Sequence, residues 1–319
     1  METEKSLKSA TEHPDIEFQA GSGIHVYEGV PYPWFVHAVT LDALKTFEVR
    51  NDDVYVISFP KSGTTWLQEI ISMIYYNGDV EKITSIHVEE RVPHLEMSTA
   101  KPGNILYKKI ANMPRDKPRL IKTHMAFDTM PANFHKKNAK AIYVARNYKD
   151  ICVSAFHFLR MFTAYTDDQR MSSWEDFLLK MMIPMQSPYG SWVHHVTSWW
   201  ENRHDKKVLF LKYEDMKRDL RGAVIKICDH LGKKLSEEAL QKTVDQCTFK
   251  KMSKNPMANF TGLKDFDLNV SKFMRKGGVG DWMNHFTVAQ NKLMDSVLRD
   301  GLKGTGLEFE YEPTEVEQK

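Results

Sequence analysis

Residues 59–66 of the chain read F-P-K-S-G-T-T-W. An apolar run precedes this stretch, and apolar residues with helical spacing follow it. The pattern predicts a buried strand over 54–59, a short polar loop and a helix over 64–76. Backbone N–H groups converge at the start of such a helix, and the helix dipole favours negative charge there. The stretch therefore predicts an anion-binding loop, to which Lys61 adds a positive charge.

The order of residues in this loop differs from the order in nucleotide kinases. A kinase loop reads G-x-x-x-x-G-K-[ST], with the lysine after the second glycine, whereas Lys61 here comes before Gly63. The loop can therefore bind phosphate without holding Mg²⁺ and a transferable phosphoryl group. For the loop taken alone, the alternative is an ordinary helix start that serine and threonine side chains cap.

Further motifs follow the loop in order along the chain. They are K-T-H at 122–124, Y-V-A-R-N-x-K-D-x-x-V-S at 143–154, Y-E-D-M at 213–216, N-P-M-x-N at 255–259 and F-M-R-K-G at 273–277. With the loop, they resemble the cytosolic sulfotransferases over roughly residues 30 to 310. The resemblance implies an enzyme that takes a sulfuryl group from 3′-phosphoadenylyl sulfate (PAPS) as co-substrate. The product would be adenosine 3′,5′-bisphosphate, and no metal would be needed.

Composition narrows the classes of partner. The 319 residues carry a net charge of +2 and a pI near 8.2, which does not favour a nucleic-acid binder with its strongly basic face. Three widely spaced cysteines predict neither a disulfide framework nor a zinc site. The chain shows no apolar run of about 18 residues and no secretory signal, so the expectation is no membrane span and a cytoplasmic protein.

Short apolar runs alternate with helical patterns, which predicts an α/β fold with a central parallel sheet flanked by helices. We expect a flexible tail over 1–20 and one domain over 21–319. The predicted strands are 54–59, 119–123, 140–145 and 207–212, and the predicted helices are 64–76, 148–160, 174–182, 191–203, 218–231, 236–246 and 287–300. Ser172-Ser173-Trp174-Glu175 reads as a capping box, and Gly232 as a helix end.

His124 is the candidate general base, because a neutral imidazole accepts a proton at neutral pH. It follows a predicted strand two residues after Lys122, so both side chains are expected on the same face. The family resemblance assigns the base to His124 and assigns stabilisation of the transferring group to Lys61 and Lys122. Where the family usually has Leu-Pro after this histidine, the chain has Met125-Ala126.

The donor-binding residues are also assigned by the resemblance. Arginine suits a phosphate because its planar fork donates two hydrogen bonds, and Arg146 with Ser154 is expected at the 3′-phosphate. A surface ion pair with Asp150 is the alternative for Arg146. The full expected donor set is Lys61, Ser62, Gly63, Thr64, Thr65, Trp66, Arg146, Ser154, Tyr213, Cys247, Thr248, Phe249, Phe273, Met274, Arg275, Lys276 and Gly277, in which Trp66 and Phe249 would stack on the purine.

The expected acceptor pocket contains His124, Phe158, His94 and Met97. Relatives often carry V-P-[aromatic]-L-E-[aromatic], but the chain has V-P-H-L-E-M at 92–97. Both gate aromatics are therefore replaced, and a small Ala155 adds room. We expect a roomy apolar pocket with one polar group at its mouth. The acceptor would be a small apolar phenol, alcohol, steroid or amine.

Two other functions remain open from the sequence: a non-catalytic binding protein of the same fold, and a nucleotide kinase. The oligomer is expected to be a monomer or a weak homodimer. The family's C-terminal dimer segment reads K-x-x-x-T-V-x-x-x-E, and the chain keeps Thr287 and Val288 but has Met283 and Lys292 at the charged positions. Loss of the complementary charges weakens a two-fold contact.

Overall fold

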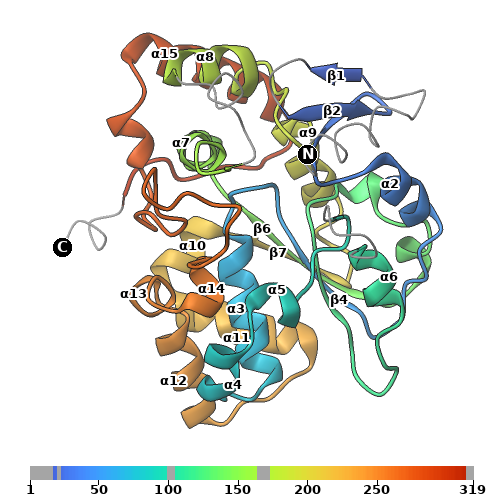
Figure 1. The fold of residues 1–319 in the computed structure, drawn as a ribbon. Helices are drawn as coiled ribbons and strands as arrows, with labels where there is room; N and C mark the ends of the chain where they lie inside the picture. The colour runs from blue at the N-terminus through green and yellow to red at the C-terminus, as the bar shows by residue number, and fades with distance from the viewer. Residues whose placement is uncertain (1–16, 20–22, 99–104, 164–172, 314–319) are drawn as a thin grey trace.

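The computed structural model describes residues 17–19, 23–98, 105–163 and 173–313 (Figure 1). Its centre is a parallel sheet with the strand order β5-β4-β6-β7. The strands are β4 (Val54–Ile57), β5 (Leu120–Thr123), β6 (Lys140–Ala145) and β7 (Val208–Lys212). The α/β fold with a central parallel sheet is confirmed, and each predicted strand lies within two residues of the observed one.

Successive side chains on a strand point to opposite sides of the sheet. Both sides are buried because helices pack on each of them. Tyr55 and Tyr143 belong to the core cluster that packs on α7 (Tyr148–Leu159), α9 (Trp192–Glu201) and α15 (Val288–Leu302). Val56 and Val144 belong to the cluster on the other face. That face packs on α3 (Thr64–Tyr75), α10 (Tyr213–Arg218), α11 (Leu220–Leu231) and α12 (Glu237–Gln246). Figure 1 shows α3, α11 and α12 gathered below and α7, α8 and α15 above.

Several elements lack a strong periodic signal and were not predicted. An antiparallel sheet joins β1 (Glu17–Gln19), β2 (Ile24–Tyr27) and β3 (Val30–Pro33). Strand β1 pairs with β2, so residues 17–19 are not part of a free tail, and residues 1–16 lie outside the described chain. The short helices are α2 (Ala38–Lys45), α4 (Val80–Ser85), α5 (Val88–Arg91), α6 (Leu106–Ala111), α13 (Phe249–Met252), α14 (Pro256–Asn259), η1 (Phe127–Thr129), η2 (Phe134–Lys136) and η5 (Asp281–Asn284).

Helix boundaries differ from the predicted ones where a cap intervenes. Ser191, Ser236 and Thr287 precede their helices as N-caps and accept hydrogen bonds from backbone N–H groups. The predicted helix over 218–231 begins after Asp219, whose side chain accepts from the N–H of Gly222. The cap therefore separates α10 from α11.

The predicted helix over 174–182 is α8 (Trp174–Phe177) continued by the π-helical turn η4 (Leu178–Met182). Its N-cap is Ser173, which accepts from the N–H of Asp176, so the capping box starting at Ser172 is wrong by one residue; Ser172 itself lies outside the described residues. Gly232 does end α11, in a left-handed conformation with φ 64°.

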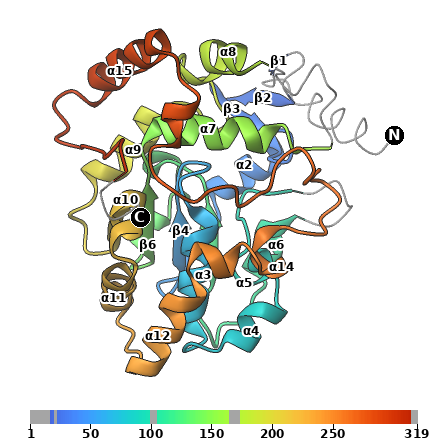
Figure 2. The same cartoon turned by 90° about the vertical axis from the view of Figure 1, so that its left-hand side faces the viewer.

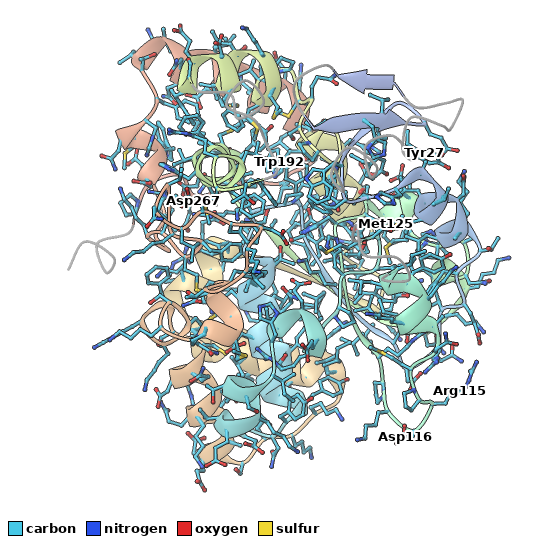
Figure 3. All side chains as sticks on the ribbon, in the orientation of Figure 1. Tyr27, Arg115, Asp116, Met125, Trp192 and Asp267 are labelled. Carbon is cyan, nitrogen blue, oxygen red and sulfur yellow. The ribbon has the colours of Figure 1, made fainter. Side chains whose placement is uncertain are left out.

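The order of the strands in the parallel sheet predicts where a ligand binds. The chain passes from β4 to β5 on one side and then to β6 on the other, so the order reverses between β4 and β6. In parallel α/β sheets, ligands bind beyond the carboxyl ends of the strands at this point. In Figure 2, α7 lies between α8 and α15 above and strands β4 and β6 below. Figure 3 shows Met125, which follows β5, inside the molecule, whereas Arg115 and Asp116 project from the loop before β5.

Candidate active site

A cavity of about 1580 Å³ opens beyond the carboxyl ends of β4, β5 and β6. Cavities for one drug-sized ligand usually measure about 300–1,000 Å³, so this one has room for two ligands together. Most of the predicted residues line it, namely Lys61, Gly63, Thr64, Thr65, Trp66, His94, Met97, Lys122, His124, Arg146, Ser154, Phe158, Tyr213, Phe249, Phe273, Met274, Arg275, Lys276 and Gly277.

Three predicted donor residues do not line the cavity. Ser62 is buried, and its hydroxyl has no hydrogen-bond partner within the part of the chain that the structure describes. The carbonyl of Cys247 accepts from Trp66 Nε1 at 2.7 Å, and Thr248 caps α13 by accepting from the N–H of Lys251. Cys247 therefore supports Trp66, and Thr248 supports the start of α13, without lining the cavity themselves.

The loop after β4 presents the start of α3 to the cavity. Gly63 precedes α3 with φ 107°, a conformation that favours glycine, and no side chain of the described residues caps the helix there. A Cβ at Gly63 would lie 2.9 Å from the ring of Tyr213, so the position has no room for a side chain. The Ser58 and Thr64 hydroxyls bond to each other at 2.5 Å. The first backbone N–H groups of α3 are thus available to an anion.

Lys61 sits in this loop with φ 69° and faces an aromatic wall. Its Nζ lies 3.7 Å from the ring centre of Phe158 and 4.6 Å from that of Phe273, which is cation–π geometry. Burial, together with the positive charges of Lys122 and Arg146, lowers the pKa of Lys61 to about 7. The lysine is therefore partly neutral before any anion binds.

His124 follows β5, and its ring orientation fixes its tautomer. Nδ1 lies 2.7 Å from the carbonyl oxygen of Ser58. Since a carbonyl only accepts, Nδ1 carries the hydrogen, and in the neutral ring Nε2 is the unprotonated acceptor. Burial and the neighbouring His94 and Lys122 hold the pKa of His124 well below its usual range. His124 is thus neutral at pH 7 and able to accept a proton.

Buried side chains that sequence reasoning missed hold the backbone of His124. Its N–H donates to Glu96 Oε1 at 2.6 Å. Its carbonyl accepts from His195 Nε2 at 3.0 Å, and the hydroxyl of Tyr143 donates to His195 Nδ1 at 2.9 Å. His195 comes from α9, far along the chain, and no local pattern marks this contact.

His94, the polar side chain of the expected acceptor pocket, lies deeper in the protein than expected. His94 is 3% exposed, its ring lies 5.0 Å from that of His124, and its Nε2 lies 2.9 Å from Glu96 Oε1. The prediction of a polar group at the pocket mouth is therefore wrong, because the Glu96 carboxylate holds the imidazole beside the candidate base. Further unpredicted residues complete the wall, namely Phe35, Glu89, Phe162, Tyr189, Phe260 and Phe266.

Lys122 is placed by the sheet and by an acidic partner. It pairs in register with Val56, and its Nζ donates to Glu89 Oε1 at 2.8 Å. Lys122 and His124 both line the cavity, as the alternation of an extended segment predicts. The ammonium groups of Lys61 and Lys122 and the imidazole of His124 therefore meet at one edge of the sheet.

Arg146 follows β6 and reaches across to two loops. Its guanidinium donates to the carbonyls of Lys61 at 3.3 Å and Gly278 at 3.1 Å, and it stacks over the ring of Tyr213 at 4.3 Å. It also forms the alternative ion pair with Asp150, at 3.9 Å, although the Asp150 carboxylate is buried and the distance is longer than a hydrogen bond. Its Nε group is buried and has no hydrogen-bond partner among the described residues.

The two predicted purine contacts, Trp66 and Phe249, both line the cavity. Trp66 meets Tyr213 edge to face at 5.2 Å, and Phe249 is 37% exposed. A Cβ at Gly277 would lie 2.2 Å from the Phe249 ring, so only glycine fits against that ring. The aromatic faces and the basic segment at 275–276 thus adjoin one another along the cavity.

The described residues contain neither a metal-binding cluster nor a membrane-spanning helix. Over 17–19, 23–98, 105–163 and 173–313, no group of three His, Cys, Asp or Glu residues is arranged to hold a metal ion. Within the same ranges, no helix is long and apolar enough to cross a membrane.

Comparison with known proteins identifies close relatives. The family model described as Sulfotransferase domain matches residues 51–306. Sulfotransferase 1E1 of Bos taurus is 45% identical over 268 residues, covering 83% of this chain and 88% of that protein. Sulfotransferase 1C2 of Homo sapiens is 41% identical over 269 residues, with the same shares of both proteins.

Two solved structures are similar over almost the whole chain. The crystal structure of retinol dehydratase with androsterone and the inactive cofactor PAP has a TM-score of 0.79 at 26% identity, covering 97% of this chain and 96% of that one. The crystal structure of mouse sulfotransferase SULT7A1 with PAP has a TM-score of 0.71 at 31% identity, covering 89% and 95%.

Proposed function

The chain belongs to the sulfotransferase family, and from this premise we propose that it transfers the sulfuryl group of PAPS to a hydroxyl or amine of a small apolar acceptor, with His124 as general base. The observation that carries the proposal is the hydrogen bond from His124 Nδ1 to Ser58 at 2.7 Å. It leaves Nε2 as a proton acceptor in the same cavity as Lys61 and Lys122.

The reaction needs positioning and charge stabilisation more than covalent help from the protein, as in phosphoryl transfer. The start of α3 and Lys61 would hold the donor's 5′-phosphosulfate. Arg146, Ser154 and the segment 275–277 would hold its 3′-phosphate, and Trp66 and Phe249 its purine. Every member of these groups lines the cavity.

At the acceptor, His124 Nε2 would take the proton of the attacking group. The new bond forms between the acceptor oxygen or nitrogen and sulfur, and the bond from sulfur to the bridging phosphate oxygen breaks. That oxygen keeps the electron pair, and the charges of Lys61 and Lys122 would stabilise it. The products are the sulfated acceptor and adenosine 3′,5′-bisphosphate.

Transfer of radiolabelled sulfate from PAPS to a panel of phenols, alcohols, steroids and amines tests the proposal. Labelled product from at least one class supports sulfuryl transfer. Tight binding of the nucleotide without any product across the panel would indicate a binding protein instead. EDTA-sensitive transfer of phosphate from ATP without any sulfated product would favour the metal-dependent kinase alternative.

We predict that Arg146→Ala weakens binding of adenosine 3′,5′-bisphosphate far more than binding of adenosine 5′-phosphate. A hydrogen bond to a charged group contributes about 1.5–3 kcal/mol, which only the 3′-phosphorylated ligand should lose. Calorimetric titration of both nucleotides measures the difference. An equal loss for both would show that Arg146 does not contact the 3′-phosphate.

For the acceptor, the roomy aromatic pocket supports bulky apolar molecules. Ala155 and Met97 line it with Phe158, and the similar structure of retinol dehydratase holds androsterone. We predict that the double variant His94→Phe and Met97→Phe improves small planar phenols relative to bulky alcohols, because aromatic pairs add about 0.5–1.5 kcal/mol beyond burial. Ratios of kcat/KM for the two acceptor classes measure this. If the order of kcat/KM values for the two acceptor classes does not change, neither side chain determines acceptor choice.

We propose a monomer or a weak homodimer. Val288 at the start of α15 is 75% exposed, so an apolar contact is available there. Met283 and Lys292 nevertheless supply no complementary charge pair, and a patch this small falls well below the usual area of a stable interface.

A further inference from the structure

The basic pair Arg275-Lys276 is held by a carboxylate of its own segment. Asp281 Oδ2 accepts from Arg275 Nη2, and Asp281 Oδ1 accepts from Lys276 Nζ at 2.5 Å. Asn284 Nδ2 also donates to Oδ1, at 2.9 Å. The Asp281 side chain is 9% exposed, so the two cations meet a nearly buried anion at the edge of the cavity.

The turn that carries Asp281 is fixed to α7. Gly280 has φ 86°, and its N–H donates to Asp150 Oδ2 at 2.8 Å. The N–H of Trp282 donates to Asp150 Oδ1 at 3.0 Å, and Asp150 is buried. The same turn accepts a hydrogen bond from Arg146 through the carbonyl of Gly278. Arg146 and the segment 275–276 are therefore connected through one turn.

We infer that Asp281 is a positioning residue for the 3′-phosphate: it orients Arg275 and Lys276 before the nucleotide arrives, and it stays in place when the nucleotide binds. The inference rests on the proposed function, since it assumes that this cation pair receives the 3′-phosphate. It assigns a role to an acidic residue in a site that must attract an anion.

The alternative is that Asp281 competes with the phosphate for the two cations. The geometry favours positioning, because Asn284 and the turn pinned by Asp150 hold the carboxylate from behind. A guanidinium has five N–H donors and an ammonium three, so Arg275 and Lys276 keep donors for a phosphate while bound to Asp281. Ordering flexible side chains in advance removes a cost that binding would otherwise carry.

The protonation state agrees with this role. Burial acts to raise the pKa of Asp281, but hydrogen bonds from Lys276, Asn284 and Arg275 outweigh it and lower the pKa to about 2. The carboxylate is therefore charged at every pH at which the protein would be assayed, and it stays a fixed partner for both cations.

The test is calorimetric titration of Asp281→Asn with adenosine 3′,5′-bisphosphate and with adenosine 5′-phosphate. We expect binding of the bisphosphate to weaken about tenfold, the lower end of what partners that orient a ligand-binding group contribute at metal sites. Binding of the monophosphate should change less than about twofold, because its contacts lie at the start of α3. The KM for PAPS should rise with kcat at saturation unchanged.

Asp295→Asn is the matched control, because Asp295 pairs with Lys149 at 2.5 Å in the same C-terminal region and contacts neither Arg275 nor Lys276. It should leave both affinities unchanged. If Asp281→Asn does not fold, Asn284→Ala removes only the rear hydrogen bond to Asp281 and should weaken the bisphosphate selectively by about threefold, a smaller loss in keeping with one neutral hydrogen bond.

Two results would overturn the inference while the proposed function stands. An equal loss for both nucleotides would make Asp281 merely structural, and tighter binding of the bisphosphate would make it a competitor. A wild-type protein with no preference for the 3′-phosphorylated nucleotide would instead contradict the proposed function, and this inference with it.

Discussion

Replacing His124 with alanine is expected to lower kcat by about 10²–10⁴-fold, the usual contribution of a general base. Binding of adenosine 3′,5′-bisphosphate should stay within about twofold, because the proposed phosphate contacts lie on other residues. The backbone bonds of His124 to Glu96 and His195 do not depend on its side chain, so the fold around residue 124 should persist. Sulfuryl-transfer rates and calorimetric titration of the two proteins measure the two expectations.

His204→Ala is the matched control, since His204 lies in an exposed turn before β7, and it should keep full activity. The pH profile adds a second check. The pKa of His124 lies well below its usual range, so the imidazole stays neutral between pH 8 and 6.5. Activity should therefore not fall through this group until the pH drops below the ordinary histidine value near 6.5. More than half of wild-type activity in His124→Ala would show that another group is the base.

The sheet and the loop could be predicted because their signals are local. Strands β4 and β6 are apolar on both faces, and this gives the continuous runs typical of buried parallel strands. The polar stretch at 60–65 interrupts that pattern where a helix begins. Parallel strands end at the same edge of a sheet, which brings Lys61, Lys122 and Arg146 near one another, and all three line the cavity.

The support of the site could not be predicted, because it depends on contacts between distant segments. His195 on α9 bonds to the carbonyl of His124 across 71 residues of sequence. Cys247 was itself a predicted donor contact, but its carbonyl accepts a hydrogen bond from Trp66, 181 residues away in the sequence. Spacing and periodicity describe neighbours on one element, so they cannot distinguish a residue that contacts a ligand from one that supports it.

His94 shows the same limit on the acceptor side. The sequence identified it as a replacement for a gate aromatic and implied a polar group near solvent. The buried carboxylate of Glu96 instead holds the imidazole inside. A buried polar side chain is stable where it finds a hydrogen-bond partner, and Glu96, two residues further along in the following turn, is that partner.

Replacing Lys61 with methionine is expected to lower kcat by about 10²–10³-fold, the typical effect of removing one group that stabilises transition-state charge. Methionine keeps the apolar stem against Phe158 and Phe273 and removes only the ammonium. Lys61→Arg should retain a larger share of the rate, because it keeps the charge. Lys226→Met, an exposed position on α11, is the control that should leave turnover unchanged.

Lys61 should also make donor affinity depend on pH. Its pKa is lowered to about 7 in the nucleotide-free protein, so above pH 7 the lysine is mostly neutral. The negative charges of a bound donor favour the ammonium, so binding takes up a proton and affinity falls as pH rises. The loss should approach about tenfold per pH unit above 7 and should be absent in Lys61→Met. Calorimetric titration of adenosine 3′,5′-bisphosphate at pH 7 and pH 8.5 measures it. The same pH dependence in both proteins would mean that the ammonium of Lys61 does not bind the donor.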